Sequence, residues 1–162
     1  MAFDAFLKID GIKGESRDDR RRDEIEVLSF SWGESQTGTV AHGGGGGAGK
    51  VAMQDFHFTA LFSKASPALF LACASGQHLP EALLSIRGAG ENPQDFLKWR
   101  LSDILVSSYQ TEGIAHGDAG RPTDQFSLNF AQIEVEYSPQ KPDGSLDQSI
   151  KAGWDLKKNA PA

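Results

Sequence analysis

Residues 126–137, which read FSLNFAQIEVEY, decide the fold of this chain. Apolar and polar side chains alternate along the first half, which is the two-residue period of a β-strand with one buried face. The second half continues the alternation from the opposite face. The apolar positions are Phe126, Leu128 and Phe130, followed by Ile133, Val135 and Tyr137. A strand that exchanges its buried face in mid-course contains a bulge or a bend, so we expect one here.

The same exchange occurs in two other stretches, residues 24–33 and residues 96–109. In the first, Ile25 and Val27 give way to Leu28, Phe30 and Trp32; in the second, Leu97, Trp99 and Leu101 give way to Ile104 and Val106. One flat sheet does not need three such exchanges, whereas strands that pass from one wall of a structure to another do. The sequence therefore predicts a mainly β protein, with two antiparallel sheets curled into a β-barrel.

Further strands are expected on either side of these stretches. Strand alternation marks residues 2–12, 54–62 and 81–87, and a last strand carries Ile150, Ala152, Trp154 and Leu156 after a turn at residues 142–144. One short flanking helix is predicted over residues 67–75. Ser66 would cap it, Pro67 would occupy its first position and Gly76 would end it. Its buried face would carry Leu69, Phe70 and Cys73.

Length and composition predict one globular domain, residues 1–162, with a short polar tail at about 158–162. The chain has 162 residues, 39% of them hydrophobic, and 18 glycines, which is enough apolar material for one core. Its formal net charge of −6 argues against a partner made of nucleic acid. Opposite charges nearly cancel in residues 14–23, so we expect a solvated loop there.

The sequence indicates synthesis in the cytoplasm and no membrane insertion. Asp4, Lys8 and Asp10 interrupt the start, where a secretory signal needs an unbroken apolar stretch. The longest uncharged run, residues 65–80, contains polar and helix-breaking residues and is shorter than a membrane span. Because a single cysteine, Cys73, cannot form an internal disulfide, the fold does not require an oxidising compartment.

A glycine-rich segment at about residues 36–50 contains five consecutive glycines, Gly43 to Gly47. Residues 44–50 match all but the last position of a phosphate-binding loop, G-x-x-x-x-G-K-[ST], but Val51 replaces the Ser or Thr that would hold magnesium. Strand alternation follows where a helix would receive the phosphate. We expect a mobile loop between two strands; an enzyme that binds nucleotide through this loop is the weaker alternative.

No catalytic, cofactor-binding or metal-ligating residue is predicted, and the chain is not expected to be an enzyme. The four histidines have no metal-ligand spacing; they are His42, His57, His78 and His116. Asp103 interrupts an apolar strand, and we expect it to lie at a bulge, where it is solvated or hydrogen-bonded to the backbone. The aromatic side chains are expected to fill the core. Two hypotheses for the function therefore remain: a binding or assembly protein, and a barrel that binds a small ligand.

The order of several segments resembles one family. These segments are AFLKIDGIKGES, IEVLSFSWG, GGGGGAGKV, the helix SPALFLACASGQH, LVSSY, FSLNFAQIEVEYSPQKPDGS and the closing GWDLKKN. Together they resemble the haemolysin-coregulated protein (Hcp) family, whose members are tube subunits of the bacterial type VI secretion system. The resemblance covers about residues 2–160.

The resemblance implies a ring-forming hexamer. Rings of such subunits stack into a hollow inner tube, and contraction of a surrounding sheath propels the tube, capped by a spike, out of the cell. Effector proteins are held and protected in the lumen. The partners implied are further copies of the chain, effectors, the spike protein and the sheath. Secretion then needs no signal peptide.

The resemblance also implies two sets of contact residues. The glycine-rich segment would reach adjacent subunits and the next ring through His42, Gly43, Gly44, Gly45, Gly46, Gly47, Gly49 and Lys50. The polar segment 111–124 is a candidate for the mouth or wall of the lumen, where Thr111, Glu112, His116 and Asp118 would contact effectors. Glycine suits a loop that remodels against a partner, because it allows positive φ and close backbone approach.

Overall fold

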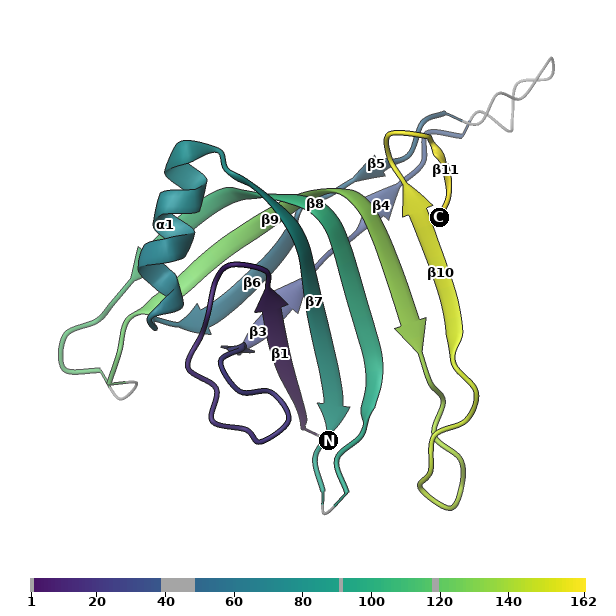
Figure 1. Cartoon of the computed structure of the whole chain (residues 1–162), viewed down its shortest axis with the longest axis horizontal. Helices are drawn as coiled ribbons and strands as arrows, with labels where there is room; N and C mark the ends of the chain where they lie inside the picture. Colours follow the sequence, from purple (N-terminus) through teal and green to yellow (C-terminus); the bar gives the residue numbers. More distant parts are fainter. Residues whose placement is uncertain (1, 39–48, 91, 118–119) are drawn as a thin grey trace.

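The computed structural model describes residues 2–38, 49–90, 92–117 and 120–162. These residues form one helix and eleven strands, all paired antiparallel, which confirms a mainly β fold with one short helix (Figure 1). The strands are β1 (Phe3–Ile9), β2 (Ile25–Val27), β3 (Ser29–Ser31), β4 (Glu34–Ser35), β5 (Ala52–Met53), β6 (Phe56–Leu61), β7 (His78–Gly88), β8 (Asp95–Glu112), β9 (Thr123–Tyr137), β10 (Ile150–Asp155) and β11 (Ala160–Pro161), and the helix is α1 (Ala65–Ser75).

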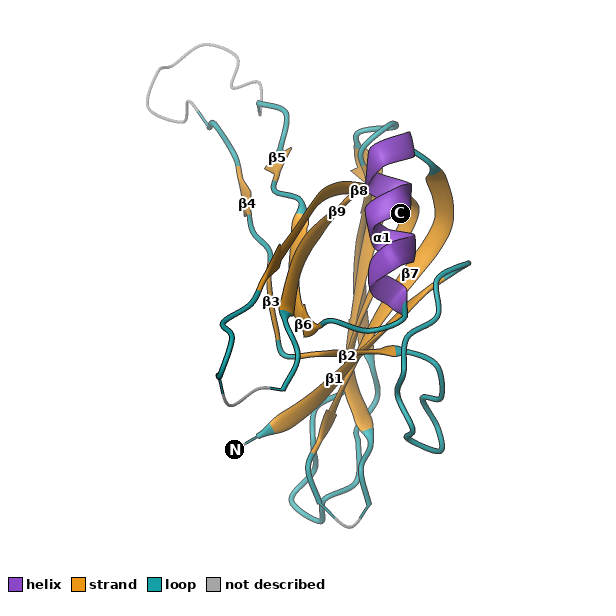
Figure 2. Cartoon of the chain, turned by 90° about the vertical axis from the view of Figure 1, so that its left-hand side faces the viewer, coloured by secondary structure: helices purple, strands orange, loops and turns teal. Residues whose placement is uncertain are grey.

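The two longest strands, β8 and β9, connect two parts of one large sheet. They pair with each other from Leu97↔Tyr137 to Glu112↔Thr123. The C-terminal half of β9 pairs with β10, while its N-terminal half pairs with β6. The strand order is β11-β10-β9-β8-β7-β1-β2, and β3 joins through β6. Both walls of the structure therefore share β8 and β9, which curve from one to the other (Figure 2).

The sequence predicted two sheets curled into a barrel, and the barrel part of this prediction is wrong. The main strands belong to one bent nine-stranded sheet, and the described residues do not form a closed barrel. The chain runs from β2, which pairs with β1, to β3, which pairs with β6. Leu28 separates these two three-residue ladders and leaves 59% of its side chain exposed. The chain changes its pairing partner at Leu28, whose amide donates a hydrogen bond to the Thr59 carbonyl on β6 (2.7 Å).

A crease crosses the sheet at Pro80, Asp103 and Ala131, which lie side by side on β7, β8 and β9. The flanking pairs are Leu79↔Ile104, Glu81↔Ser102, Ser102↔Gln132 and Ile104↔Phe130. Each strand exchanges its buried face here: Leu79 to Ala82, Leu101 to Ile104, and Phe130 to Ile133. Asp103 has a φ of 52°, a left-handed conformation inside a strand. The exchanges predicted in residues 96–109 and 126–137 are confirmed, and they are in register.

Stacked aromatic rings fill the space between the walls. The ring centroids of Phe56 and Phe58 on β6 lie 5.0 Å apart, and those of Phe58 and Phe126 lie 5.2 Å apart. All three side chains are buried. This confirms that aromatic side chains of these strands fill the core, and it leaves the middle of the fold packed with side chains.

Helix α1 begins two residues earlier than predicted and is capped differently. Lys64 is the N-cap residue and makes no side-chain cap, so the prediction that Ser66 caps the helix is wrong. The hydroxyl of Ser66 instead accepts a hydrogen bond from the Ser63 amide (2.9 Å) and donates one to the buried carboxylate of Asp124. Gly76 ends the helix with a φ of 66°, as predicted.

The buried face of α1 differs from the predicted one. Its buried residues are Ala65, Ser66, Leu69 and Ala72, and Cys73 is half-buried. Phe70, predicted on this face, leaves 60% of its surface exposed and stands edge-on to Tyr109. Leu69 and Phe70 are adjacent and therefore about 100° apart on a helix, so a narrow contact with the sheet buries only one of them.

Residues 14–23 form a mostly exposed loop, as predicted, and two ion pairs hold it on the sheet. Arg87 on β7 donates to both carboxylate oxygens of Asp18, at 3.0 Å for Oδ1, and its guanidinium lies 4.8 Å from the centre of the Phe6 ring. Arg21 pairs with Asp95 on β8. The hydrogen bonds from Arg87 lower the pKa of Asp18 from 3.8 to about 2. The loop is thus tied to the sheet by two arginine–carboxylate pairs.

Replacing Leu69 with alanine tests the contact between α1 and the sheet. Leu69 is 1% exposed, so Leu69→Ala removes buried methyl groups and should lower the free energy of unfolding by about 3 kcal/mol. Leu28→Ala, at an exposed position, should lower it by less than about 1 kcal/mol. Urea denaturation followed by tryptophan fluorescence measures both, and equal losses would contradict the packing described.

The Asp18–Arg87 pair should make stability depend on pH below about 4. Because the folded-state pKa of Asp18 is lowered, the pair contributes fully above the ordinary carboxyl pKa, and its contribution is lost as pH falls towards 2. The difference in unfolding free energy between the wild-type chain and Asp18→Asn should therefore shrink between pH 4 and 2. Asp19→Asn is the matched control, since the Asp19 side chain is 94% exposed. A difference that stays constant with pH refutes the assignment.

Candidate interaction surfaces

Strands β4 and β5 form a two-stranded ribbon, here called the arm, which stands away from the main sheet (Figure 2). Glu34 pairs with Met53 and Ser35 with Ala52. The Trp32 indole donates to the Gln54 carbonyl at the base (2.9 Å). A strand follows Lys50, as predicted, where a phosphate-binding loop would begin a helix.

The predicted contact loop is described only in part. Gly49 and Lys50 lie beside the arm and belong to the described residues. His42 and Gly43 to Gly47 lie outside them. Gly49 is held close to the opposite side of the arm: a Cβ there would lie 2.5 Å from Thr37 Oγ1 and 2.7 Å from the Thr37 carbonyl oxygen. Glycine at this position is therefore required by close approach of the two segments.

A groove of about 620 Å³, here called the tryptophan groove, lies between the arm and strands β8, β9 and β10. Its residues are Trp32, Glu34, Ser35, Gln36, Val51, Met53, Trp99, Ile133, Val135, Ala152, Gly153 and Trp154. The ring centroids of Trp32 and Trp99 are 5.5 Å apart. Glu34 is the only charged residue among them.

Two indole groups of the tryptophan groove lack hydrogen-bond partners. The Nε1 atoms of Trp99 and Trp154 are buried and have no partner among the described residues. Sequence reasoning missed this groove, because it assigned the aromatic side chains to the core. The available signal was that all three tryptophans lie in stretches predicted as strands, but the pairing that brings these stretches together is long-range.

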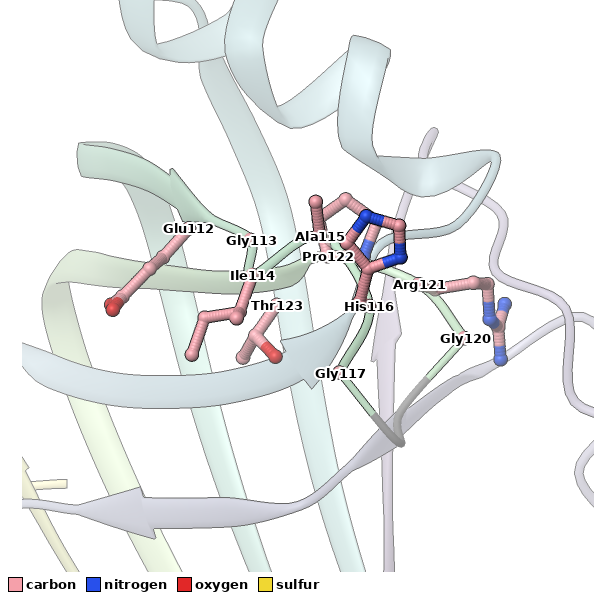
Figure 3. A pocket seen from close by; sticks show the side chains of 10 residues that line it. All are labelled: Glu112, Gly113, Ile114, Ala115, His116, Gly117, Gly120, Arg121, Pro122 and Thr123. Carbon is pink, nitrogen blue, oxygen red and sulfur yellow. The ribbon is translucent and has the colours of Figure 1, made fainter.

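The hairpin between β8 and β9 carries a second hollow, of about 630 Å³ (Figure 3). Thr111 and Glu112 end β8 and pair with Asp124 and Thr123. Glu112 and His116 line the hollow, whereas Thr111 does not. Of the four residues predicted to contact effectors, three are thus exposed along one hairpin. The fourth, Asp118, lies outside the described residues.

The side chains around this hollow do not converge on one point. Figure 3 shows Glu112 and Arg121 pointing to opposite sides of the hairpin. Arg121 donates hydrogen bonds to the Glu15 carboxylate (3.2 Å) and to the Phe62 carbonyl (3.1 Å). His116 has a φ of 68°, which the turn requires. The hollow presents an exposed loop surface rather than a set of groups arranged for chemistry.

A buried carboxylate anchors the root of this hairpin to α1. Asp124 is 2% exposed and accepts hydrogen bonds from the Ser66 hydroxyl on α1 and the Tyr109 hydroxyl on β8, the latter at 2.9 Å. Burial, with the hydrogen bond to Asp124, raises the pKa of Tyr109. The cluster is fully hydrogen-bonded, as a buried carboxylate requires.

Asp103, the carboxylate singled out from the sequence, is paired on the surface. It accepts a hydrogen bond from Lys157 (2.7 Å) and lies 3.2 Å from His78 Nδ1. The hydrogen bonds from Lys157 and His78 lower its pKa. The prediction of a residue at a bulge is wrong here, because the pairing of β8 has no register shift at Asp103, which lies on the crease instead.

Two absences concern the part of the chain that the structure describes. Within it, no three His, Cys, Asp or Glu side chains are grouped as metal ligands. Within the same residues, no helix has the length and apolar character that crossing a bilayer takes.

Comparison with known proteins identifies the class to which this fold and these surfaces belong. A family model described as "Type VI secretion system effector, Hcp" matches residues 6–137. Protein hcp1 of Pseudomonas aeruginosa is 49% identical over 164 residues, which covers 100% of both chains. The crystal structure of Hcp1 from Salmonella typhimurium is 36% identical, with a TM-score of 0.82 over 100% of each chain. A structure described as a type six secretion system protein is 32% identical, with a TM-score of 0.93 over 99% of this chain and 100% of the other.

The fold is therefore that of a type VI secretion protein. The chain belongs to the Hcp family, as its segment order predicted.

Substitution of Gly49 tests the close approach within the arm. Gly49→Ala should separate the two sides of the arm and raise hydrogen-exchange rates of amides near residues 34–38, because the added methyl group meets Thr37. The free energy of unfolding should change by less than about 0.5 kcal/mol, since the main sheet is untouched. Gly88→Ala, where a Cβ meets nothing within 4 Å, is the control. Unchanged exchange in the arm would show that the approach is not close.

Proposed function

We propose that this chain is a structural, secreted subunit of the type VI inner tube, without catalytic activity. The observation that carries the proposal is the agreement along the whole chain with the structure of Hcp1 from Salmonella typhimurium, at a TM-score of 0.82. In the proposed assembly six copies form a ring and rings stack into a hollow tube. Sheath contraction propels the tube, with the spike at its end, and the subunit leaves the cytoplasm without a signal peptide.

A ring of identical subunits needs two different surfaces on each copy, because each contact is heterologous. The arm and the tryptophan groove lie on one side of the molecule, and α1 lies on the other (Figure 1). The packed sheet between them gives each copy a fixed shape. A rigid body with distinct surfaces on its two sides is what ring closure requires.

The glycine-rich segment is proposed as the contact between rings. Its members are His42, Gly43 to Gly47, Gly49 and Lys50. Ordering roughly nine residues against a partner costs several kcal/mol at ~1 kcal/mol per residue, so the contact between rings should be weak and reversible.

The β8–β9 hairpin is proposed to face the lumen and contact effectors through Thr111, Glu112, His116 and Asp118. The first three are exposed and polar, which suits weak binding of varied cargo. Small-ligand binding inside the fold is not favoured, because stacked phenylalanines occupy the interior.

Light scattering tests the proposed ring. The purified chain at micromolar concentration should give a particle of about six times the 17.5 kDa of one chain. Electron microscopy of the same sample should show rings with an open centre. A stable monomer across the micromolar range contradicts the proposal.

Shortening Gly43–Gly47 to two residues separates ring formation from stacking. The ring should keep its mass, because the main sheet is unaltered, while the amount of stacked material that sediments at high speed should fall. An unfolded variant would show that the segment is part of the folded core rather than a contact between rings.

A further inference from the structure

Residues 14–24, here called the strap, form most of the loop between β1 and β2 and are closed at their base (Figure 1). The Ser16 amide donates a hydrogen bond to the Glu24 carbonyl (3.0 Å), and the Asp23 amide donates one to the Ser16 carbonyl (3.1 Å). A Cβ at Gly14 would lie 2.5 Å from the Glu24 carbonyl oxygen. The two ends of the strap are therefore in direct contact, and the backbone of Glu24 is fixed between them.

Charged side chains fasten the strap to the rest of the molecule. Each contact joins one strap residue to β7, to β8, to one of the two hairpins that flank β8, or to the residue that begins α1. The contacts are Asp18–Arg87, Arg21–Asp95, Arg20–Pro93 carbonyl, Glu15–Arg121 and Asp23–Lys64. Because these contacts depend on charge, the hold of the strap responds to ionisation of its members.

Glu24 is a buried carboxylate at the closed end of the strap. It is 7% exposed, and its Oε1 atom is buried without a hydrogen-bond partner among the described residues. Its Oε2 atom lies 3.7 Å from the Arg21 guanidinium. Burial raises the pKa of Glu24 above its ordinary value of 4.5, and the charges of Arg21 and Lys8 offset this only in part. The ionised carboxylate therefore gains hydration when the strap opens, which favours opening.

The charged groups around Glu24 come from every element packed against it. Arg21 and Asp18 lie on the strap itself, and Lys8 lies on β1. Arg21 also pairs with Asp95 on β8, more closely than with Glu24. A hollow of about 800 Å³ opens beside Glu24, and its other charged residues are Lys8, Asp10, Lys13, Asp19, Arg20, Arg22, Asp23 and Lys64. Among these types of side chain, only carboxylates titrate between about pH 2 and 7.

Asp18 and Glu24 respond to pH in opposite directions. Hydrogen bonds from Arg87 lower the pKa of Asp18 to about 2, so its contribution to the closed strap is lost as pH falls towards that value. The pKa of Glu24 is raised, so its contribution is complete when the carboxyl group is neutral and is lost as pH rises. Both groups favour the closed strap only in the range between these two losses.

We propose that the strap is a pH-dependent latch, held most tightly at about pH 4 to 5 and loosened on either side of this range. Towards neutral pH, ionisation of Glu24 loosens the latch; in stronger acid, protonation of Asp18 does so. Opening also releases Arg121 on the β8–β9 hairpin and Lys64 at the start of α1 from their strap partners. The latch is a property of the single chain and does not depend on the formation of rings.

Hydrogen exchange measures the opening of the strap. The amides of Ser16 and Asp23 bridge its two ends, so their protection, corrected for the intrinsic pH dependence of exchange, reports the ratio of closed to open strap. In the wild-type chain this protection should rise at least about threefold as pH falls from about 7 to 5, since one pH unit of displacement in a pKa corresponds to a tenfold change in this ratio. It should fall again below about pH 4.

Substitutions separate the two titrating groups. Glu24→Gln removes the charge at nearly constant shape, so its protection at about pH 7 should already match that at about pH 5. Glu24→Met, which removes the hydrogen-bonding group as well, should behave in the same way. Glu26→Gln is the matched control on the same strand, because Glu26 is exposed, and it should keep the wild-type profile. Asp18→Asn should remove the fall in acid and retain the rise between about pH 7 and 5.

The wild-type profile and the variants can each overturn the proposal. Protection of the strap amides that stays constant or decreases from about pH 7 to 5 contradicts it, as does a Glu24→Gln chain that keeps the wild-type rise. Protection of amides in β8 and β9, followed in the same samples, distinguishes opening of the strap from unfolding of the sheet. Light scattering tests the ring separately: a monomer whose strap responds to pH as described retains the latch and rejects the ring.

Discussion

The structure depends on the crease that crosses β7, β8 and β9 at Pro80, Asp103 and Ala131. Along this line three neighbouring strands exchange their buried faces together. Below the crease the sheet packs on one side, and above it on the other, so one continuous hydrogen-bonded sheet supplies two walls. A crease in only one strand would turn its apolar residues to solvent while its neighbours kept theirs inside. The register of the three exchanges is therefore the constraint that the fold satisfies.

The positions of the β8–β9 hairpin and of the tryptophan groove follow from that bend. Strands β8 and β9 extend past the crease, so their hairpin reaches the side where α1 packs. On the other side of the bend, β8 pairs with β9 and β9 pairs with β10. These three strands form the floor of the tryptophan groove, and the arm lines its other side. The tryptophan groove and helix α1 thus lie on opposite sides of a single curved sheet, and neither needs a domain of its own.

Much of this fold could be predicted from local pattern, and the failures have physical causes. The exchange of the buried face in residues 126–137 was predicted correctly, because it shows in the order of apolar and polar residues along the chain. Phe70 was misplaced because helical spacing gives an apolar stripe but not the width of the contact that covers it. Ser66 looked like a cap, yet its hydroxyl meets Asp124, 58 positions away. The tryptophan groove was missed for the same reason: Trp32, Trp99 and Trp154 converge only through long-range pairing.

The buried Asp124 gives the molecule a mechanical property. Its carboxylate joins the hydroxyl of Ser66 on α1 to that of Tyr109 on β8, while its backbone belongs to the ladders of β6, β8 and β9. A displacement of the β8–β9 hairpin is therefore transmitted directly to α1, because the Asp124 side chain is hydrogen-bonded to both. The chain obtains this connection between helix and hairpin from one side chain rather than from a covalent cross-link.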